Sequence, residues 1–332
     1  MQPVINSAPA IQTPIDQQST LKSEAVAVAP ALSNASTQDL RAAQNSSVRP
    51  TQIKTVSEAI EAFAGAVIRE HNLDQFSAMP VDAILEPLKA YTPHEIMSFI
   101  QDFKDLAKEI DQAQSSGKAS LTAGSPDAGK SSLFKALAKE QHAAFLDFDR
   151  SALQGVKLYQ KMRGNQTPEE AKAAYIKFRG ASQTLHNCLM PYAISKKKDL
   201  AIAITSTSKF FAVTVKSLQQ HGYKVDLHHM TCPHDVRETS NNNRNAQGQY
   251  QCDSKDFETK GQDFYKKTAD YLNVKDVQFW VRPVADGAPI LAAQTINSEK
   301  FVFDRPALDQ LLETHKKEGA ESHQLLKDYF NV

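Results

Sequence analysis

The segment Gly124-Ser-Pro-Asp-Ala-Gly-Lys-Ser131 follows the pattern G-x-x-x-x-G-K-[ST] and separates two stretches of different character. Residues 118–123 form a short run typical of a buried strand, whereas the apolar side chains of 133–137 recur at helical spacing. In a strand–loop–helix unit, the N–H groups of such a loop and the first turn of the helix surround phosphate groups. Gly124 and Gly129 permit a close approach that a Cβ atom would prevent. The segment therefore predicts a phosphate-binding loop (residues 124–131) that holds a nucleoside triphosphate.

The motif assigns a role to individual residues of this loop. Lys130 is expected to reach the β- and γ-phosphates of ATP, and the Ser131 hydroxyl is expected to bind Mg²⁺. Asp127 is unusual, because a carboxylate repels phosphate and must either face solvent or weaken binding. The predicted residues for ATP and Mg²⁺ are Gly124, Ser125, Pro126, Asp127, Ala128, Gly129, Lys130, Ser131 and Ser132.

Composition excludes several classes of protein. The 332 residues carry a formal net charge of zero, which gives no electrostatic basis for binding nucleic acid or an anionic membrane. No apolar run approaches the roughly 20 residues of a membrane span, and no cleavable signal peptide is recognisable. The three widely spaced cysteines argue against a disulfide framework. A reducing, cytoplasmic environment is the simplest interpretation.

The chain divides into three predicted regions. Residues 1–50 are rich in Ala, Ser, Gln, Pro and Asn and predict a disordered tail, which is either a plain extension or a secretion or partner-binding segment. Residues 51–117 form a helical lead-in, in which Thr92-Pro-His-Glu95 is a capping box that starts a helix and Gly117 is a candidate stop. Residues 118–332 form the domain that contains the phosphate-binding loop.

Strand-like and helix-like segments alternate after the loop. This alternation predicts an α/β fold: a P-loop NTPase-like, doubly wound parallel sheet that binds ligands at the carboxyl ends of its strands. Helices are expected at 168–195 and 209–221, and one or two more at 306–329. The remaining predicted strands are Ala144–Asp147, Leu200–Ile204, Tyr223–His228 and Val277–Val281.

Two acids stand at the end of the strand that follows the loop helix, in Leu146-Asp-Phe-Asp-Arg150. A kinase needs a carboxylate near the γ-phosphate to accept the proton of the acceptor hydroxyl and to help place Mg²⁺. We predict Asp149 as this catalytic base and Mg²⁺ ligand, with Asp147 and Arg150 in contact with the substrate. Helix capping by either aspartate is the alternative.

Polar residues also follow the next two strands. The hydroxyls of Thr205 and Thr207 could bind a polar substrate group, although an ordinary helix-capping cluster explains them equally well. Arg237 and Arg244 lie on a predicted helix and could offset charge on the transferred phosphoryl group. We predict Arg244 as catalytic and Arg237 as substrate-binding, against the alternative of a solvated helix face. The compact group at 228–234 lacks the two separated ligand pairs of a structural zinc site.

The order of these parts resembles the zeta toxin family of P-loop kinases, from about Ala119 to Tyr265. The D-x-D pair is expected to end the second strand, with Asp149 similar to the family's catalytic base. A Gly-Tyr pair, a proline and an arginine follow in the family's order as Gly222-Tyr223, Pro233 and Arg244. The family loop G-x-P-x-x-G-K-[ST] is matched by Gly124, Pro126, Gly129, Lys130 and Ser131.

The resemblance implies an ATP-dependent kinase that phosphorylates a hydroxyl of a nucleotide, dinucleotide or nucleotide sugar. It further implies a toxin or secreted effector that acts in the cytoplasm of its own cell or of a host, restrained by an antitoxin-like protein at its N-terminal region. Thr205-Ser206-Thr207 stands where the family has Glu-Gly-Thr, so the substrate-binding glutamate is missing. The alternative is therefore a degenerate nucleotide-binding interaction protein without phosphotransferase activity. A switch GTPase is disfavoured because no N-K-x-D motif is present.

Overall fold

The fold is known from a computed structural model that describes residues 54–147, 167–208, 211–247 and 254–332. The chain divides into two units, Met1–Gln52 and Ile53–Val332, and all described residues belong to the second. The predicted tail therefore lies outside the described residues. Among the described helices, none has the length and apolar character needed to cross a membrane.

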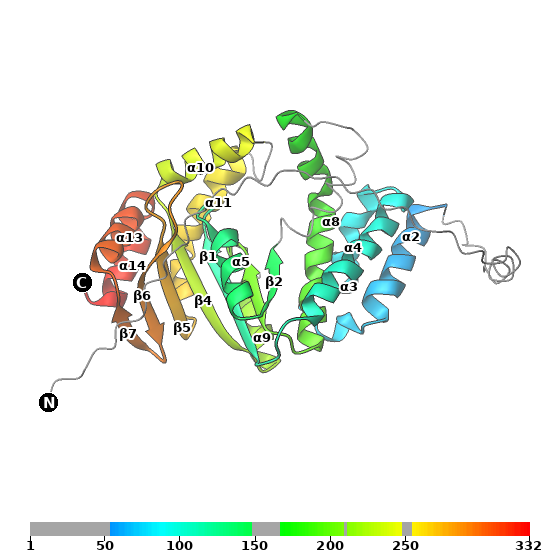
Figure 1. The fold of residues 1–332 in the computed structure, drawn as a ribbon, viewed down its shortest axis with the longest axis horizontal. Coiled ribbons are helices and arrows are strands. Elements are labelled where there is room, and N and C mark those ends of the chain that lie inside the picture. Colours follow the sequence, from blue (N-terminus) through cyan, green and yellow to red (C-terminus); the bar gives the residue numbers. More distant parts are fainter. Residues whose placement is uncertain (1–53, 148–166, 209–210, 248–253) are drawn as a thin grey trace, which may run out of the picture. The chain divides into compact units, whose positions relative to one another are not determined.

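A seven-stranded sheet forms the centre of the second unit (Figure 1), with the strand order β2-β3-β1-β4-β5-β6-β7. The first five strands in this order are parallel, and β6 and β7 continue the sheet in antiparallel pairing. The strands span Lys118–Gly124 (β1), Ala144–Asp147 (β2), Leu200–Ala203 (β3), Lys224–Thr231 (β4), Asp276–Val281 (β5), Ile290–Ile296 (β6) and Glu299–Val302 (β7).

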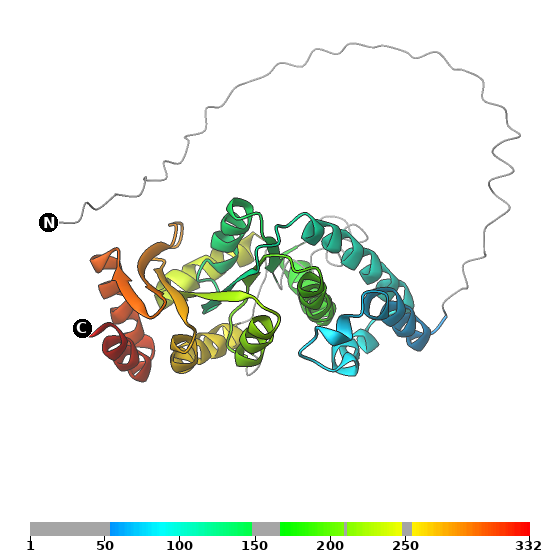
Figure 2. The same ribbon diagram turned by 90° about the horizontal axis from the view of Figure 1, so that it is seen from below.

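Helices cover both faces of the sheet (Figure 2). On β4, His228 contacts Phe134 of α5, whereas the adjacent His229 contacts helices α11, α12 and α13 on the opposite face. This alternation follows from the two-residue period of a strand. The helices are α5 (Lys130–Glu140), α8 (Pro168–Ser195), α9 (Phe211–Gln220), α10 (His234–Ala246), α11 (Ser254–Lys266), α12 (Thr268–Leu272), α13 (Arg305–Glu318) and α14 (Ala320–Phe330).

The lead-in is helical and packs at the β2 edge through α4 (Pro93–Asp111) and α8 (Figure 1). The Thr92 hydroxyl accepts a hydrogen bond from the Glu95 N–H, and the Glu95 carboxylate accepts one from the Thr92 N–H. The predicted capping box therefore starts α4. The other lead-in segments are α2 (Val56–Phe63), a π-helical turn (Ala64–Arg69), the 3₁₀ turns Leu73–Gln75 and Glu86–Ala90, and α3 (Val81–Leu85).

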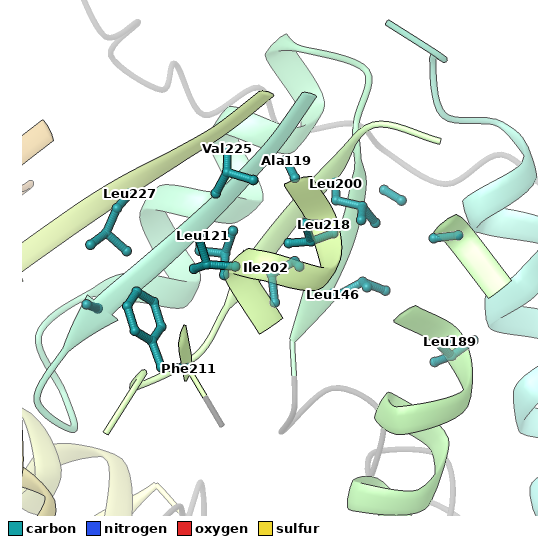
Figure 3. Packing of buried hydrophobic residues seen from close by; sticks show 14 of the residues in the cluster. Ala119, Leu121, Leu146, Leu189, Leu200, Ile202, Phe211, Leu218, Val225 and Leu227 are labelled. Atoms are coloured by element: carbon teal, nitrogen blue, oxygen red, sulfur yellow. The ribbon is translucent and has the colours of Figure 1, made fainter. Parts of the chain in front are cut away.

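One hydrophobic cluster joins the lead-in to the sheet. Figure 3 shows its centre, where Leu121 of β1, Ile202 of β3 and Leu227 of β4 pack beside Phe211 and Leu218 of α9. The same cluster extends to the aromatic side chains of α4. Burial of this continuous apolar surface is what holds the lead-in against the sheet.

The predicted parallel α/β sheet with a helical lead-in is confirmed. Two expectations differ from the structure. The helix that starts at Pro93 ends at Asp111, six residues before Gly117, and Gly117 instead turns the chain into β1 with a φ of 79°. The hairpin of β6 and β7 was not predicted, and it extends the sheet beyond the parallel strands.

Candidate active site

The predicted phosphate-binding loop joins β1 to the first turn of α5. Gly129 adopts a φ of 88° immediately before the helix begins at Lys130, so the loop N–H groups and the helix N-terminus meet at the carboxyl end of β1. The Lys130 ammonium folds back over the loop and donates a hydrogen bond to the Ser125 carbonyl at 2.6 Å. The loop thus encloses a positively charged side chain at the sheet edge where ligands bind.

The two motif glycines are required by close packing. A Cβ atom at position 124 would lie 2.8 Å from the Met230 carbonyl oxygen of the neighbouring strand, nearer than such atoms approach. A Cβ atom at position 129 would lie 3.2 Å from Arg282 Cδ and would also have to accept a left-handed backbone conformation. The absence of side chains therefore sets the shape of the loop.

The Asp127 carboxylate is buried, with 1% of its side chain exposed, and does not face solvent. Arg244 of α10 donates a hydrogen bond from Nη1 to its Oδ1 at 2.5 Å. Arg282, immediately after β5, donates from Nη1 to the Asp127 carbonyl at 2.9 Å. The negative charge within the loop is therefore opposed by an arginine from another element, an arrangement that the sequence did not reveal.

A cavity of about 1160 Å³ opens over the loop and the carboxyl ends of β2 and β3. Of the predicted loop residues, Pro126, Asp127, Gly129, Lys130, Ser131 and Ser132 line it, whereas Gly124, Ser125 and Ala128 are buried and do not line it. The predicted catalytic Arg244 also lines the cavity, as does Arg282.

The strand ends bring further predicted residues to this cavity. Asp147, the last residue of β2, is buried and lines it, and so does Thr205 after β3. Thr207 lies 3.2 Å from Thr205 between hydroxyl oxygens but does not itself line the cavity. Asp149 and Arg150, the predicted base and its neighbour, lie outside the described residues.

Arg237 lies away from the cavity and is 1% exposed. Its guanidinium stacks over the Phe257 ring at 4.7 Å and approaches Gly261, where a Cβ atom would be 3.0 Å from Nη1. Arg237 Nη2 lies 3.8 Å from the Glu318 carboxylate oxygen Oε2. The structure therefore places Arg237 in the contact between α10 and α11, and Arg237 is not among the residues that line the cavity.

One wall of the cavity comes from α8, a helix that was predicted without any functional residues. Its cavity-facing residues (the α8 stripe) are Tyr175, Arg179, Gln183, His186, Asn187 and Met190. Burial lowers the pKa of His186 to about 4, although the nearby Asp147 carboxylate acts in the opposite direction, so this imidazole is neutral at pH 7. Arg179, Gln183 and Asn187 are spaced four residues apart and therefore lie on one helix face. This spacing could have revealed the polar face from the sequence.

The described residues do not bring histidines and acids together as a metal site. Among the described residues, no group of three or more His, Cys, Asp or Glu side chains is placed to hold a metal ion. His228 and His229 point to opposite faces of β4, as the strand alternation predicts, with His228 stacked on Trp280 and His229 on His315.

Comparison with known proteins gives one family match. The family model described as Zeta toxin matches residues 104–261, from the middle of α4 to α11. No curated protein matches the chain.

Solved structures give weaker similarities. A crystal structure of AvrRxo1-ORF1:-ORF2 with ATP aligns at 10% identity and a TM-score of 0.49, covering 67% of this chain and 73% of that chain. The PezAT chromosomal toxin-antitoxin system of the human pathogen Streptococcus pneumoniae aligns at 17% identity and a TM-score of 0.40, covering 70% and 97%.

The family match spans most of the elements that build the cavity, namely the phosphate-binding loop, the Asp147 strand end, the α8 wall and Arg244, but not Arg282. The similarity of this chain to the zeta toxin family therefore extends over residues 104–261.

Proposed function

We propose that this protein is an ATP-dependent kinase that phosphorylates a hydroxyl group of a nucleotide-type small molecule. The observation that carries the proposal is the meeting of three groups at one cavity: the phosphate-binding loop, cations from α10 and the end of β5, and an acid at the end of β2. Phosphoryl transfer depends on positioning and on charge stabilisation, and these are the groups it needs.

The loop fits a triphosphate by its shape and charge. Its glycines leave a cradle that a Cβ atom would fill, and Lys130 is already folded over it. Bound ATP would supply the phosphoryl group, and Mg²⁺ would offset part of its charge. Lys130 and the loop N–H groups would hold the phosphates, and Ser131 would offer its hydroxyl to the metal. Arg244 and Arg282 would stabilise charge on the moving group.

The acceptor hydroxyl requires a base at the end of β2. We assign this role to Asp149, with Asp147 in support, because Asp147 ends the strand that opens on the cavity and Asp149 comes two residues later in the sequence. Thr205 lines the same cavity and would contact the acceptor in place of the missing family glutamate.

The test is phosphoryl transfer by purified protein, measured by mass spectrometry with ATP and a panel of nucleoside phosphates, dinucleotides and nucleotide sugars. We expect a product heavier by one phosphoryl group with the wild type, and a loss of at least about 100-fold with Lys130→Ala or Asp149→Asn. Comparison of Asp147→Asn with Asp149→Asn identifies the base. Lys135→Ala is the matched control, because Lys135 is exposed on α5 and does not line the large cavity.

A protein that binds ATP but phosphorylates no member of the panel would contradict the kinase proposal. It would favour the degenerate interaction protein, for which the buried Asp127 and the missing glutamate are the specific observations.

The family assignment extends the proposal to a toxin or effector that acts in a cytosol and is restrained by a protein partner. Depletion of a nucleotide-type metabolite would slow growth, so expression of the wild-type chain in bacteria is expected to arrest growth more than expression of Asp149→Asn. A partner would be recognised as a protein whose co-expression restores growth. Equal growth with both chains would contradict the toxic role.

A further inference from the structure

We propose that the edge strand β7 is an interaction surface on which two copies of this chain associate, by antiparallel pairing of β7 with β7 about a two-fold axis. β7 is the last strand of the sheet (Figure 1), and within the described part of the chain no further strand pairs with its outer side. None of its residues lines the large cavity, so the inference is independent of the proposed kinase function.

The hairpin of β6 and β7, with the loop before it, carries most of the exposed apolar side chains. Among the described residues, ten large apolar side chains are exposed, and six of them lie in residues 284–303. Three are consecutive: Phe301 is 41% exposed, Val302 47% and Phe303 59%. Single exposed apolar residues are normal in a folded protein, whereas a cluster of them marks a surface for association.

The backbone of β7 offers unpaired hydrogen-bonding groups along the same edge. Glu299 closes the two-residue turn with β6, so it belongs to a hydrogen-bonded pair, and such pairs alternate along an antiparallel ladder. In agreement, the Phe303 N–H donates to the Ala292 carbonyl of β6 at 3.0 Å. The N–H and C=O groups of the alternate residues, Lys300 and Val302, therefore point away from the sheet.

The usual protection of an edge strand is not found on β7. Natural edge strands are guarded by proline, by a bulge or by a lysine that stands over the open edge. β7 contains no proline, and its pairing with β6 is regular. Lys300 lies over the Tyr329 ring of α14 at 4.5 Å and donates a hydrogen bond to the Tyr329 carbonyl, so it is held against one face of the sheet. The edge is therefore open to another extended strand.

Only one register of two copies avoids a conflict. The outward backbone groups allow Lys300 to pair with Lys300, Val302 with Val302, or Lys300 with Val302 of the second copy. The first register places like charges opposite each other. The second pairs Lys300 with Asp304, whose N–H already donates to the Ala292 carbonyl at 3.2 Å. The third places Phe301 opposite Phe301 of the second copy, in a non-hydrogen-bonded pair where side chains are closest.

The charges at the two ends of β7 fit this register. Glu299 is exposed at the start of the strand, and Arg305 is exposed directly after its end. Asp304 is engaged in its own copy, where it caps α13 through the Ala307 N–H, and Arg305 forms only an exposed pair with Asp309. Antiparallel pairing brings Glu299 of each copy diagonally near Arg305 of the other, within reach of long side chains. The net charge of zero adds no repulsion between copies.

The experiment is sedimentation velocity of the full chain at several concentrations. A four-residue strand gives a contact at the low end of interface sizes, so we expect a dissociation constant on the order of 10 μM. The average mass should rise from 36.7 kDa towards twice this value across an about 100-fold range of concentration.

Two variants test the backbone pairing and the apolar contact separately. Val302→Pro removes an outward N–H without removing a hydrogen bond to β6, and Phe301→Glu places like charges at the axis. We expect each to weaken the dimer at least about tenfold. Val213→Glu is the matched control, because Val213 of α9 is 45% exposed and lies outside the hairpin; it should leave the association unchanged. Unchanged thermal unfolding at low concentration shows that each variant is folded.

Cysteine cross-linking tests the register. In a Cys252→Ser background, only the buried Cys188 and Cys232 remain. Phe301→Cys then brings two thiols opposite each other across the axis, and oxidised glutathione should join them as a disulfide-linked dimer. Val302→Cys is the control, because residue 302 lies opposite residue 300 in this register, and it should cross-link at least about tenfold more slowly.

Three outcomes would overturn the proposal. A chain that stays monomeric at every concentration leaves the β7 edge to a different occupant, such as a strand of another protein. A dimer that both Val302→Pro and Phe301→Glu leave intact is held by another surface. Equal cross-linking of Phe301→Cys and Val302→Cys contradicts the two-fold pairing. None of these measurements depends on phosphotransferase activity, so the dimer and the kinase can fail separately.

Discussion

At the scale of single residues, the most unexpected feature is Asp127, a carboxylate inside a loop built for phosphate. Its Oδ1 accepts the hydrogen bond from Arg244, but within the described part of the chain its buried Oδ2 accepts none. A buried carboxylate oxygen without a partner is destabilising. Asp127 therefore holds Arg244 beside the loop at a cost in electrostatic energy, and the same charge opposes any phosphate that enters.

We predict that Asp127→Asn binds ATP about three- to tenfold more tightly than wild type. The amide keeps the shape of the side chain but removes the charge that repels phosphate. The dissociation constant, measured by calorimetry at low salt, checks this expectation.

Asp286→Asn is the control for this change. Asp286 lines the same cavity but is exposed, so solvent screens its charge and the affinity should change by less than about twofold. Weaker ATP binding by Asp127→Asn would contradict the prediction and would mean that the ion pair is needed to shape the loop.

At the scale of elements, short sequence motifs predicted those helix starts that depend only on hydrogen bonds between neighbouring residues. The capping box at Thr92 starts α4 because its two hydrogen bonds lie within one turn. The hairpin of β6 and β7 was missed because every residue of β7 is exposed, so no alternating burial pattern marks it. Asn297 and Ser298, both with positive φ, form the turn, and this polar pair between two β-prone runs was the available signal.

The parts of the candidate site that one continuous segment forms could be predicted from the sequence. The parts that depend on contacts between distant segments could not. The phosphate-binding loop follows from its own motif. Arg282 could not be assigned, because its role depends on the loop lying beside the end of a strand more than 150 residues later in the sequence. Arg237 and Arg244 share a face of α10 but lie about 10.5 Å apart along its axis, so only one reaches the cavity.

Helix α4 contains a buried carboxyl group, that of Asp102, whose protonation affects the stability of the fold. Asp102 is 6% exposed, and burial, assisted by the nearby Asp105, raises its pKa to about 7. The native state therefore holds a proton that the unfolded chain loses near pH 4, and stability is lost as the pH rises towards and through 7. We predict that Asp102→Asn raises the free energy of unfolding by roughly 1–3 kcal/mol at pH 8 and has little effect at pH 4.

Chemical denaturation at the two pH values measures this difference. Asp105→Asn on the same helix is the control, because Asp105 is partly exposed and pairs with Lys108, so its removal should change stability by less than about 0.5 kcal/mol. An equal gain from Asp102→Asn at both pH values would show that packing, and not charge, causes the effect.

At the scale of the whole molecule, the core on one face of the sheet is organised around two histidines. His229 of β4 and His315 of α13 stack with their ring centroids 5.2 Å apart, and Phe264 and Tyr271 pack against His229. Burial lowers the pKa of His229 to about 3, and burial together with the His229 charge holds the pKa of His315 well below its usual range. Both imidazoles are therefore neutral in the native state at pH 7.

These lowered pKa values make the fold sensitive to acid. Below about pH 6.5 the unfolded chain binds protons at both positions while the native state does not, so the free energy of unfolding falls as the pH falls towards 3. Each histidine contributes up to about 1.4 kcal/mol per pH unit in this window. This dependence is opposite in sign to that of Asp102, and it couples the sheet to the C-terminal helices because His315 belongs to α13.

We predict that His229→Phe reduces the slope of the unfolding free energy against pH between pH 6 and 4. The reduction should correspond to about one proton fewer taken up on unfolding. Phenylalanine fits the surrounding aromatic side chains and cannot be protonated, so the unfolded state of this variant gains one proton fewer on acidification. Urea denaturation at several pH values measures the slope. His94→Gln removes an exposed histidine of α4 and should leave it unchanged. If His229→Phe kept the wild-type slope, the acid sensitivity would have to arise from the other buried groups, and His229 would contribute to stability only by its packing.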